Sequence, residues 1–451
     1  MIAKQRRMKQ TMIQRKWVAA LALLMGVCGC SDNGYRGTEP VDPDDADKTL
    51  VPVSLSLGKI VTIETTKGAG AIDDTEGSLG KQIWSGSKVN VFAFRDVASC
   101  DERAAAVSAD VPAPGCLIDG GGEEASADYG LVTTVNADGQ MLTLPRQIFY
   151  PTVKDATYNF FAFFCDAKRG EEGVSRTADR VSFPIEIDGT NDVMTAYAGR
   201  SNFDWNRYDR SRFDDETARH IEAWAYSVYT ERRQITPIFN FRHHLVRFRF
   251  DLYAGAPEDS VTVRSVELLD VPYKAQFTVA VAPSEDGLVD DSQLRLDFDR
   301  DQTTTLTLRE RKVETNPDGT YRSSAMVQTT PVGIAQETGS ALNPYATKVA
   351  SFGESLLVPT PDQMPHGYQC RITITQHKKR DNGTYEPAKT FYTDMEMKLG
   401  DGNAFQAGNV YTVKLAIFGA KEVKMNTTLT RWEPGGNVDM NEDDMVDYGN
   451  E

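Results

Sequence analysis

Hydrophobic and polar residues alternate along most of the chain beyond residue 50. Alternation with a period of two puts successive side chains on opposite faces of a β-strand. Val, Ile, Phe and Tyr fill many of the apolar positions, and Gly, Pro, Asn and Asp mark the breaks, as is typical of strands joined by turns. The predicted strands are 51–57, 61–66, 88–94, 156–164, 180–187, 235–253, 261–269, 275–281, 294–298, 303–308, 353–358, 368–376, 388–398 and 410–418.

One segment has a helical period instead. In residues 214–233 the apolar side chains Ile221, Trp224, Ala225 and Val228 recur at spacings of three and four. Many short strands with so few helices indicate an all-β protein built from two tandem β-sandwich domains. We place the N-terminal domain at 50–232, with the helical insertion near its end, and the C-terminal domain at 233–432.

The first residues predict an export signal. Six basic residues and no acidic ones lie in residues 1–29, and residues 17–27 form an apolar run too short to span a membrane. Val27, Cys28, Gly29 and Cys30 resemble a bacterial lipobox, so we predict a lipoprotein signal peptide at 1–29 and a lipid on Cys30. An ordinary cleaved signal with incidental cysteines is the alternative. Residues 30–49 are predicted to be an acidic tether.

Charge excludes one class of partner. The chain has 49 Lys and Arg against 65 Asp and Glu, a net charge of −16. Nucleic-acid binding needs a basic surface for phosphates, so we expect no nucleic-acid partner. Residues 433–451 are rich in acids and poor in apolar residues, which predicts an acidic tail.

Two cysteines form a candidate disulfide. Cys100 and Cys116 flank a loop rich in Pro, Ala and Ser. In an exported protein a bond between them would close a loop of about 15 residues and contribute about 3 kcal/mol. Two free thiols are the alternative, and the sequence leaves the choice open.

The sequence contains little that points to catalysis. None of its five histidines has a zinc-ligand spacing, and no GxSxG motif is present. His243 and His244 are adjacent in a predicted strand, so we expect one in the core and one at the surface. We predict no enzyme activity, no metal and no cofactor. Trp205 and Trp224 are candidate sugar-stacking aromatics, with core or interface packing as the alternative.

The order of several short motifs resembles the fimbrillin-like lipoproteins, the Mfa-like family of type V pilus subunits and anchors in Bacteroides-group bacteria. The resemblance runs from Cys30 to about Trp432. The motifs that carry it are Thr65–Lys67, Val89–Phe94, Tyr150-Pro151 with Tyr158–Phe164, Asn191–Met194, Phe239–Phe250, Gly408–Tyr411 and Trp432-Glu433. The helical insertion at 205–233 departs from the family's pattern.

The resemblance implies transthyretin-like sandwiches, a lipid anchor in the outer membrane and a place at the cell surface. It also implies assembly with other fimbrial subunits by donor-strand insertion, in which a protease removes the first strand and a neighbour's strand replaces it. Here that strand would be about 51–66, with the cut after Lys67. A cut after Arg36 is the alternative, and it would release the lipid and the tether without removing the strand. A minor, anchor or tip role and a ligand on a host or bacterial surface are left open. The alternative function is a surface glycan-binding lipoprotein.

Overall fold

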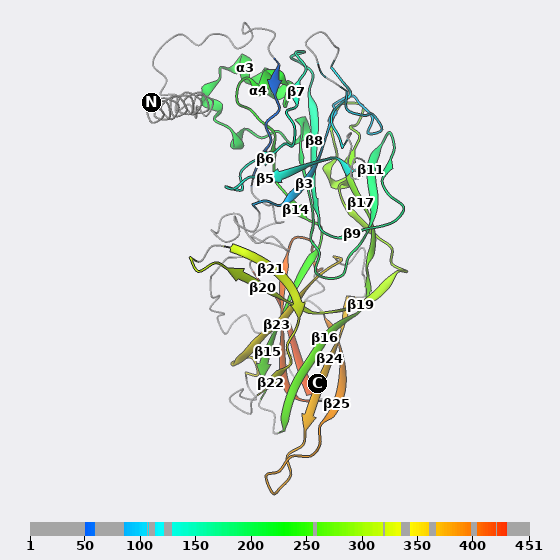
Figure 1. Ribbon diagram of the computed structural model, residues 1–451, viewed down its shortest axis with the longest axis vertical. Helices are drawn as coiled ribbons and strands as arrows, with labels where there is room; N and C mark the ends of the chain where they lie inside the picture. The colour runs from blue at the N-terminus through cyan, green and yellow to red at the C-terminus, as the bar shows by residue number, and fades with distance from the viewer. Residues whose placement is uncertain are drawn as a thin grey trace, which may run out of the picture. The chain divides into compact units, whose positions relative to one another are not determined.

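A computed structural model describes residues 50–58, 85–105, 107, 113–120, 129–255, 259–318, 321–334, 343–359, 367–397, 404–420 and 422–430. Strands dominate these residues, which confirms the predicted all-β class (Figure 1). No helix among them is long and apolar enough to cross a membrane.

A seven-stranded sheet lies at the centre of the N-terminal half, in the order β14-β12-β8-β3-β5-β6 with β4 paired to β3. Its middle strands are buried on both faces, so their sequences are apolar almost throughout, as in Tyr158–Phe163. The bounds are β3 (Lys88–Arg95), β4 (Cys116–Ile118), β5 (Leu131–Val135), β6 (Leu142–Thr143), β8 (Tyr158–Cys165), β12 (Val193–Ala198) and β14 (Arg242–His243).

One face of this central sheet packs on a second sheet, β10-β11-β17-β18 with β9 paired to β11. Aromatic rings hold the two together: Phe163 lies 5.6 Å from Phe183 and 5.7 Å from Phe277, centroid to centroid. The bounds are β9 (Lys168–Arg169), β10 (Ser175–Arg176), β11 (Arg180–Glu186), β17 (Lys274–Val281) and β18 (Leu296–Phe298). Strands from both sides of the predicted boundary at 232/233 therefore share one sheet, and the domain limits stay a prediction.

Besides two two-stranded sheets described below, two further large sheets follow. Their inward residues, such as Phe248, Val263, Ile372 and Leu415, belong to one buried cluster, which makes them a sandwich. The six-stranded sheet has β21 (Tyr321–Gln328), β20 (Arg309–Thr315), β23 (Lys348–Leu357), β15 (Val246–Ala254), β26 (Val410–Gly419) and β27 (Glu422–Thr430). The five-stranded sheet has β19 (Thr303–Thr307), β16 (Ser260–Pro272), β24 (Tyr368–His377), β25 (Lys389–Met397) and β22 (Val332–Ile334).

The predicted helix over 214–233 is instead two helices, α3 (Asp215–Ala223) and α4 (Val228–Glu231). Asp214 caps α3 by accepting a hydrogen bond from the backbone N–H of Thr217. Between the helices Tyr226 adopts a left-handed conformation with φ of 59° and is fully buried. Packing of that ring thus interrupts the helical period. Short 3₁₀ turns at Arg200–Asn202, Trp205–Arg207, Arg210–Arg212 and Asp291–Gln293 complete the helical content of the described residues.

The long strand predicted over 235–253 is three strands, β13 (Ile238–Phe239), β14 and β15. Each joins a different sheet: β13 pairs with the N-terminal segment, β14 with β12, and β15 with β23 and β26. A continuous β-pattern therefore predicted strands over most of this segment but not the breaks between them or the two changes of partner.

Candidate functional site

The segment Val51–Gly58 lies between two separate parts of the chain. Its two short strands are β1 (Val51–Pro52), which pairs antiparallel with β7 (Phe149–Tyr150), and β2 (Ser56–Leu57), which pairs parallel with β13. Figure 1 shows the segment in blue beside β7 and α4. We call Val51–Gly58 the N-terminal strand and its surroundings the groove.

Backbone hydrogen bonds hold the N-terminal strand on both edges. On one edge Val53 donates to Ile148 at 2.8 Å, Leu57 donates to Gln140 at 2.7 Å, and Leu55 accepts from Leu142 at 3.0 Å. On the other edge Ser56 donates to Pro237 at 2.9 Å and Gly58 donates to Phe239 at 2.8 Å. A strand satisfied on both edges is an interior strand, although it is linked to neither flank by a short turn.

The alternate side chains of the strand enter the core. Val53 and Leu55 are 5% and 1% exposed, and Val51 and Leu57 pack partly buried beside them. They meet the face of the central sheet that the second sheet leaves open, where Val91, Phe160 and Ala196 lie in the same cluster. The N-terminal strand and the residues around it thus form a third layer over the central sheet. Burial of this kind contributes about 1.5–3 kcal/mol per large apolar side chain.

The intervening serines meet the segment that contains the helices. The carboxyl of Glu231, in α4, is hydrogen-bonded to both the side chain and the backbone of Ser54. The Ser56 hydroxyl lies 3.1 Å from the Thr236 hydroxyl. Tyr208 fixes that residue in turn, because its hydroxyl donates to the Thr236 carbonyl at 2.6 Å. Both faces of the N-terminal strand are therefore contacted.

Burial governs the electrostatics of the groove. It raises the pKa of Glu231 to about 7, against the opposing effect of its hydrogen bonds to Ser54. Complete burial, and to a smaller extent the charge of Glu231, raises the pKa of Tyr150 well above its ordinary value. The Oε2 atom of Glu231 and the hydroxyl of Tyr150 are buried and make no hydrogen bond within the described residues. The groove thus contains two buried polar atoms that the strand leaves without a hydrogen bond.

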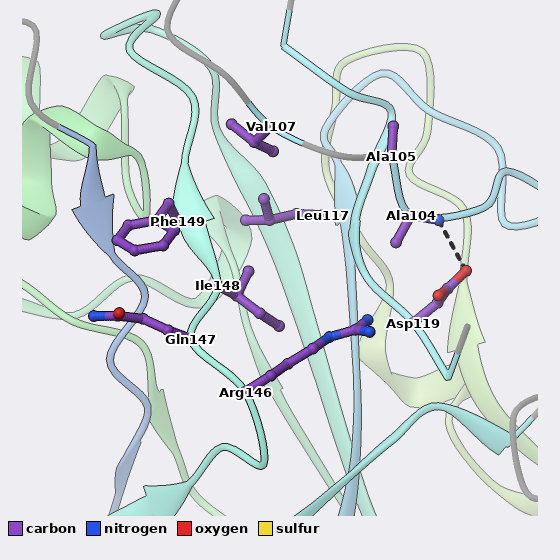
Figure 2. A pocket seen from close by; sticks show the side chains of 9 residues that line it. All are labelled: Ala104, Ala105, Val107, Leu117, Asp119, Arg146, Gln147, Ile148 and Phe149. Atoms are coloured by element: carbon purple, nitrogen blue, oxygen red, sulfur yellow. Dashed lines mark hydrogen bonds between the residues drawn. The ribbon is translucent and has the colours of Figure 1, made fainter. Parts of the chain in front are cut away.

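A cavity of about 370 Å³ adjoins β7 (Figure 2). Leu117, Ile148 and Phe149 supply much of its apolar lining, and Arg146 extends toward Asp119 across it. Asp119 already accepts a hydrogen bond from the Ala104 backbone at 2.9 Å and lies 3.6 Å from the Arg176 guanidinium. Its carboxylate is therefore engaged in structural contacts.

Three of the site residues predicted from the sequence are not among the described residues. Cys30, Arg36 and Lys67 lie outside the described residues, so lipidation and cleavage stay predictions. The same holds for the part of the predicted first strand beyond Gly58.

The structure holds Cys100 and Cys116 as free thiols and not as the candidate disulfide. Both are buried, and burial raises the pKa of each to about 12. The two are tied to different neighbours: Cys100 donates its backbone N–H to Ala178, whereas Cys116 lies in β4 and pairs with Phe94 of β3. The free-thiol alternative is the one that this geometry contains.

Trp205 and Trp224 pack within the helical segment. His220 stacks on Trp224 at 4.5 Å with an interplanar angle of 5°, and the Lys154 ammonium lies 5.4 Å from the same ring. Trp205 contacts Phe203 edge to face and donates its indole N–H to Glu222. Both indoles are half-buried against a small cluster around Ile221. The arrangement favours packing over a sugar platform.

The expectation that one of the two adjacent histidines lies at the surface is wrong, since both are buried. His243 Nδ1 lies 2.9 Å from Asp192 Oδ1, and His244 Nε2 lies 2.7 Å from the Thr195 hydroxyl. Burial lowers the pKa of His244 to about 3, which keeps it neutral. The two side chains have different partners, and both are buried. His244 lies just beyond the end of β14.

We compared the chain with known proteins. No family model matches the chain, and no curated protein matches it. A solved structure of a candidate cell adhesion protein from Bacteroides uniformis is 12% identical, with coverage of 85% of this chain and 98% of that one and a TM-score of 0.35. The fimbrial anchor protein Mfa2 from Porphyromonas gingivalis is also 12% identical, with coverage of 84% and 98% and a TM-score of 0.28.

The tip fimbrial protein Mfa3 from the same organism, with a C-terminal truncation, is 7% identical, with coverage of 84% and 100% and a TM-score of 0.29. These scores are low, and the all-β class rests on the strands of the chain itself.

Proposed function

We propose that this chain is a structural or adhesive subunit of a cell-surface fimbria, exported as a lipoprotein and joined to a neighbouring subunit by strand exchange. The observation that carries the proposal is the N-terminal strand. It is an interior strand by its hydrogen bonds and its buried side chains, yet it enters from the N-terminal end of the fold and is joined to neither flank by a hairpin.

Such a segment can be replaced without refolding the rest. Its contacts are main-chain hydrogen bonds and alternate apolar side chains, and an extended segment of another chain supplies both. The sequence resemblance supports the same reading, because the strand assigned for removal, about 51–66, begins with these residues. The flanks β7 and β13 are the surfaces that an incoming strand would pair with.

The proposal is tested with the full-length chain carrying Leu55→Asp, which places a charge at a position that is 1% exposed. The probe is a fluorescent peptide of residues 51–58, VPVSLSLG, followed by anisotropy. We expect saturable binding to the variant and much weaker binding to the unaltered chain, whose own strand competes. The peptide VPVSDSLG is the matched control. Equal binding of the two peptides to the variant would overturn the proposal.

The glycan-binding alternative has less support in the described residues. It requires aromatic rings with an open face, whereas Trp224 is stacked by His220 and Trp205 is half-buried among other rings.

A further inference from the structure

Glu231 is the one acidic side chain that the described residues place against the N-terminal strand through a hydrogen bond to a strand side chain. It comes from α4, in the helical segment that departs from the pattern of the resembled family. Its position is far from Ser54 in sequence, and it reaches the strand from the face opposite the apolar core.

We propose that Glu231 determines which strand the groove accepts, by requiring a hydroxyl-bearing residue at the position of Ser54. The inference rests on the proposed function, since it names a selectivity of the same groove.

The requirement follows from what each residue type can donate. Every strand except one with proline supplies a backbone N–H at this position, but only Ser or Thr adds a short side-chain donor there. Alanine would fit the space and leave the carboxyl with one donor fewer. Valine would fill the space and bury its methyl groups against the carboxyl. Both changes leave a buried polar group short of a partner, which is the costly outcome.

The surroundings of Glu231 make the loss hard to repair. Its Oε2 atom already lacks a partner within the described residues while Ser54 is in place. Tyr150, whose ring is fully buried, and Tyr208 lie close enough for the Glu231 charge to act on both. The carboxyl therefore sits near phenol rings, and the hydrogen bonds that it makes are those with Ser54 of the strand.

A second hydroxyl contact points the same way. Ser56 lies two residues further on the same face and meets the Thr236 hydroxyl at 3.1 Å. Its neighbour Leu55 faces the apolar core. The groove thus pairs an apolar requirement on one face with a hydroxyl requirement on the other, and the pattern that it selects is Val-Ser-Leu-Ser.

The test uses the full-length Leu55→Asp chain and four labelled peptides: VPVSLSLG, VPVTLSLG, VPVALSLG and VPVVLSLG. We expect the Ser and Thr peptides to bind with Kd values about tenfold lower than the Ala and Val peptides. Adding Glu231→Ala should abolish the preference, and Glu231→Gln should reduce it. Glu216→Gln, an exposed glutamate in α3, is the matched control and should leave the preference intact.

Equal Kd values for the Ser and Val peptides would overturn the role of Glu231 while leaving strand uptake in place. So would a preference that survives Glu231→Ala. If no peptide binds, the proposed function fails, and the contact is then judged by hydrogen exchange in the chain with Leu55 intact. There Ser54→Ala and Glu231→Ala should each accelerate exchange of the amides of 53–58 about tenfold, with no further gain in the double variant. Exchange equal to that of Glu216→Gln would overturn the inference.

Discussion

The backbone N–H of Leu142 donates to the carbonyl oxygen of Leu55 at 3.0 Å, and both side chains are buried in the same apolar cluster. This bond joins the first described strand to β6, a strand of the central sheet that lies far along the chain. The N-terminal strand is thus part of the core although the chain reaches it from its terminal side.

Leu55 should therefore contribute strongly to stability. We expect Leu55→Ala in the full-length chain to lower the free energy of unfolding by about 3 kcal/mol, because it removes buried methyl groups and leaves a cavity. Val97→Ala is the control, since Val97 is 75% exposed and should cost less than about 0.5 kcal/mol. Urea denaturation of both variants measures the difference, and equal midpoints would contradict the buried placement.

The strand should be held less firmly as the pH rises. Burial raises the pKa of Glu231 from 4.5 to about 7, so the closed groove binds a proton that the open groove releases. The free energy that proton binding by Glu231 contributes to the closed groove is fully present below about pH 4.5. It is lost as the pH rises through 7. Tyr150 and Tyr208, whose pKa values burial raises, stay neutral across this range.

Hydrogen exchange of residues 51–58 measures the effect at pH 5.5 and pH 8, after correction for the intrinsic exchange rate. We expect a larger opening constant at pH 8 in the unaltered chain and a smaller pH dependence in Glu231→Gln. An opening constant that falls with rising pH would have the wrong sign for this assignment. Burial also raises the pKa of Asp166, the residue after β8, to about 7. The variant Asp166→Asn therefore serves to separate the pH effect of Asp166 from that of Glu231.

The thiols of Cys100 and Cys116 should be inert in the native protein. Burial raises their pKa to about 12, so little thiolate forms at pH 8 and reagent has no access. We expect no labelling by iodoacetamide until denaturant is added, and complete labelling of both in denaturant without reductant. Peptide-level mass spectrometry reads the result. Protection that persists in denaturant and disappears with reductant would show the disulfide instead.

Trp224 should act in packing. Loss of its stack with His220 and its edge contact with Tyr229 at 5.0 Å should lower the melting temperature in Trp224→Ala by several degrees. Tyr392→Ala, at a ring that is 68% exposed, should leave it unchanged. If Trp224→Ala leaves the melting temperature unchanged and abolishes retention on polysaccharide, the result would contradict the packing role and favour the glycan-binding function.

The buried ion pair of Arg247 and Glu354 should matter more than an exposed one. Glu354→Gln leaves Arg247, which is 2% exposed, without its charge partner, and should cost about 3 kcal/mol. Asp394→Asn breaks the exposed pair with Arg371 at 2.7 Å and should cost less than about 1 kcal/mol. Denaturation of both variants compares them, and equal losses would argue against burial of the first pair.

Sequence patterns predict strands best where one face of the strand is exposed to solvent and the other is buried. β25 alternates cleanly, and its predicted bounds lie within a residue of the observed ones at each end. Asn382-Gly383 lies in the turn between β24 and β25, with Gly383 at φ of 80°, as suits a tight hairpin. The patterns failed where other forces decide. The strands β20 and β21 were missed because the first carries a run of charged residues and alternation gives no apolar face there.

The site was predicted only in part. The alternation of Val51–Leu57 and the family resemblance pointed to the strand that matters. Glu231 was missed because it is one of 65 acidic residues and no local motif links it to Ser54. The helical period also does not predict the break at Tyr226, with φ of 59°, that precedes the helix α4 on which Glu231 lies.

The most direct test of the central claim locks the strand in place. The Ser56 and Thr236 hydroxyl oxygens are 3.1 Å apart, so Ser56→Cys with Thr236→Cys brings two thiols within bonding reach. High-mass surface multimers are then compared, in cells that make the protein, between the double variant and each single variant. Strand exchange predicts that the locked chain reaches the surface but is absent from multimers, and that reduction restores its entry. A locked chain that enters multimers as well as the single variants would contradict the account.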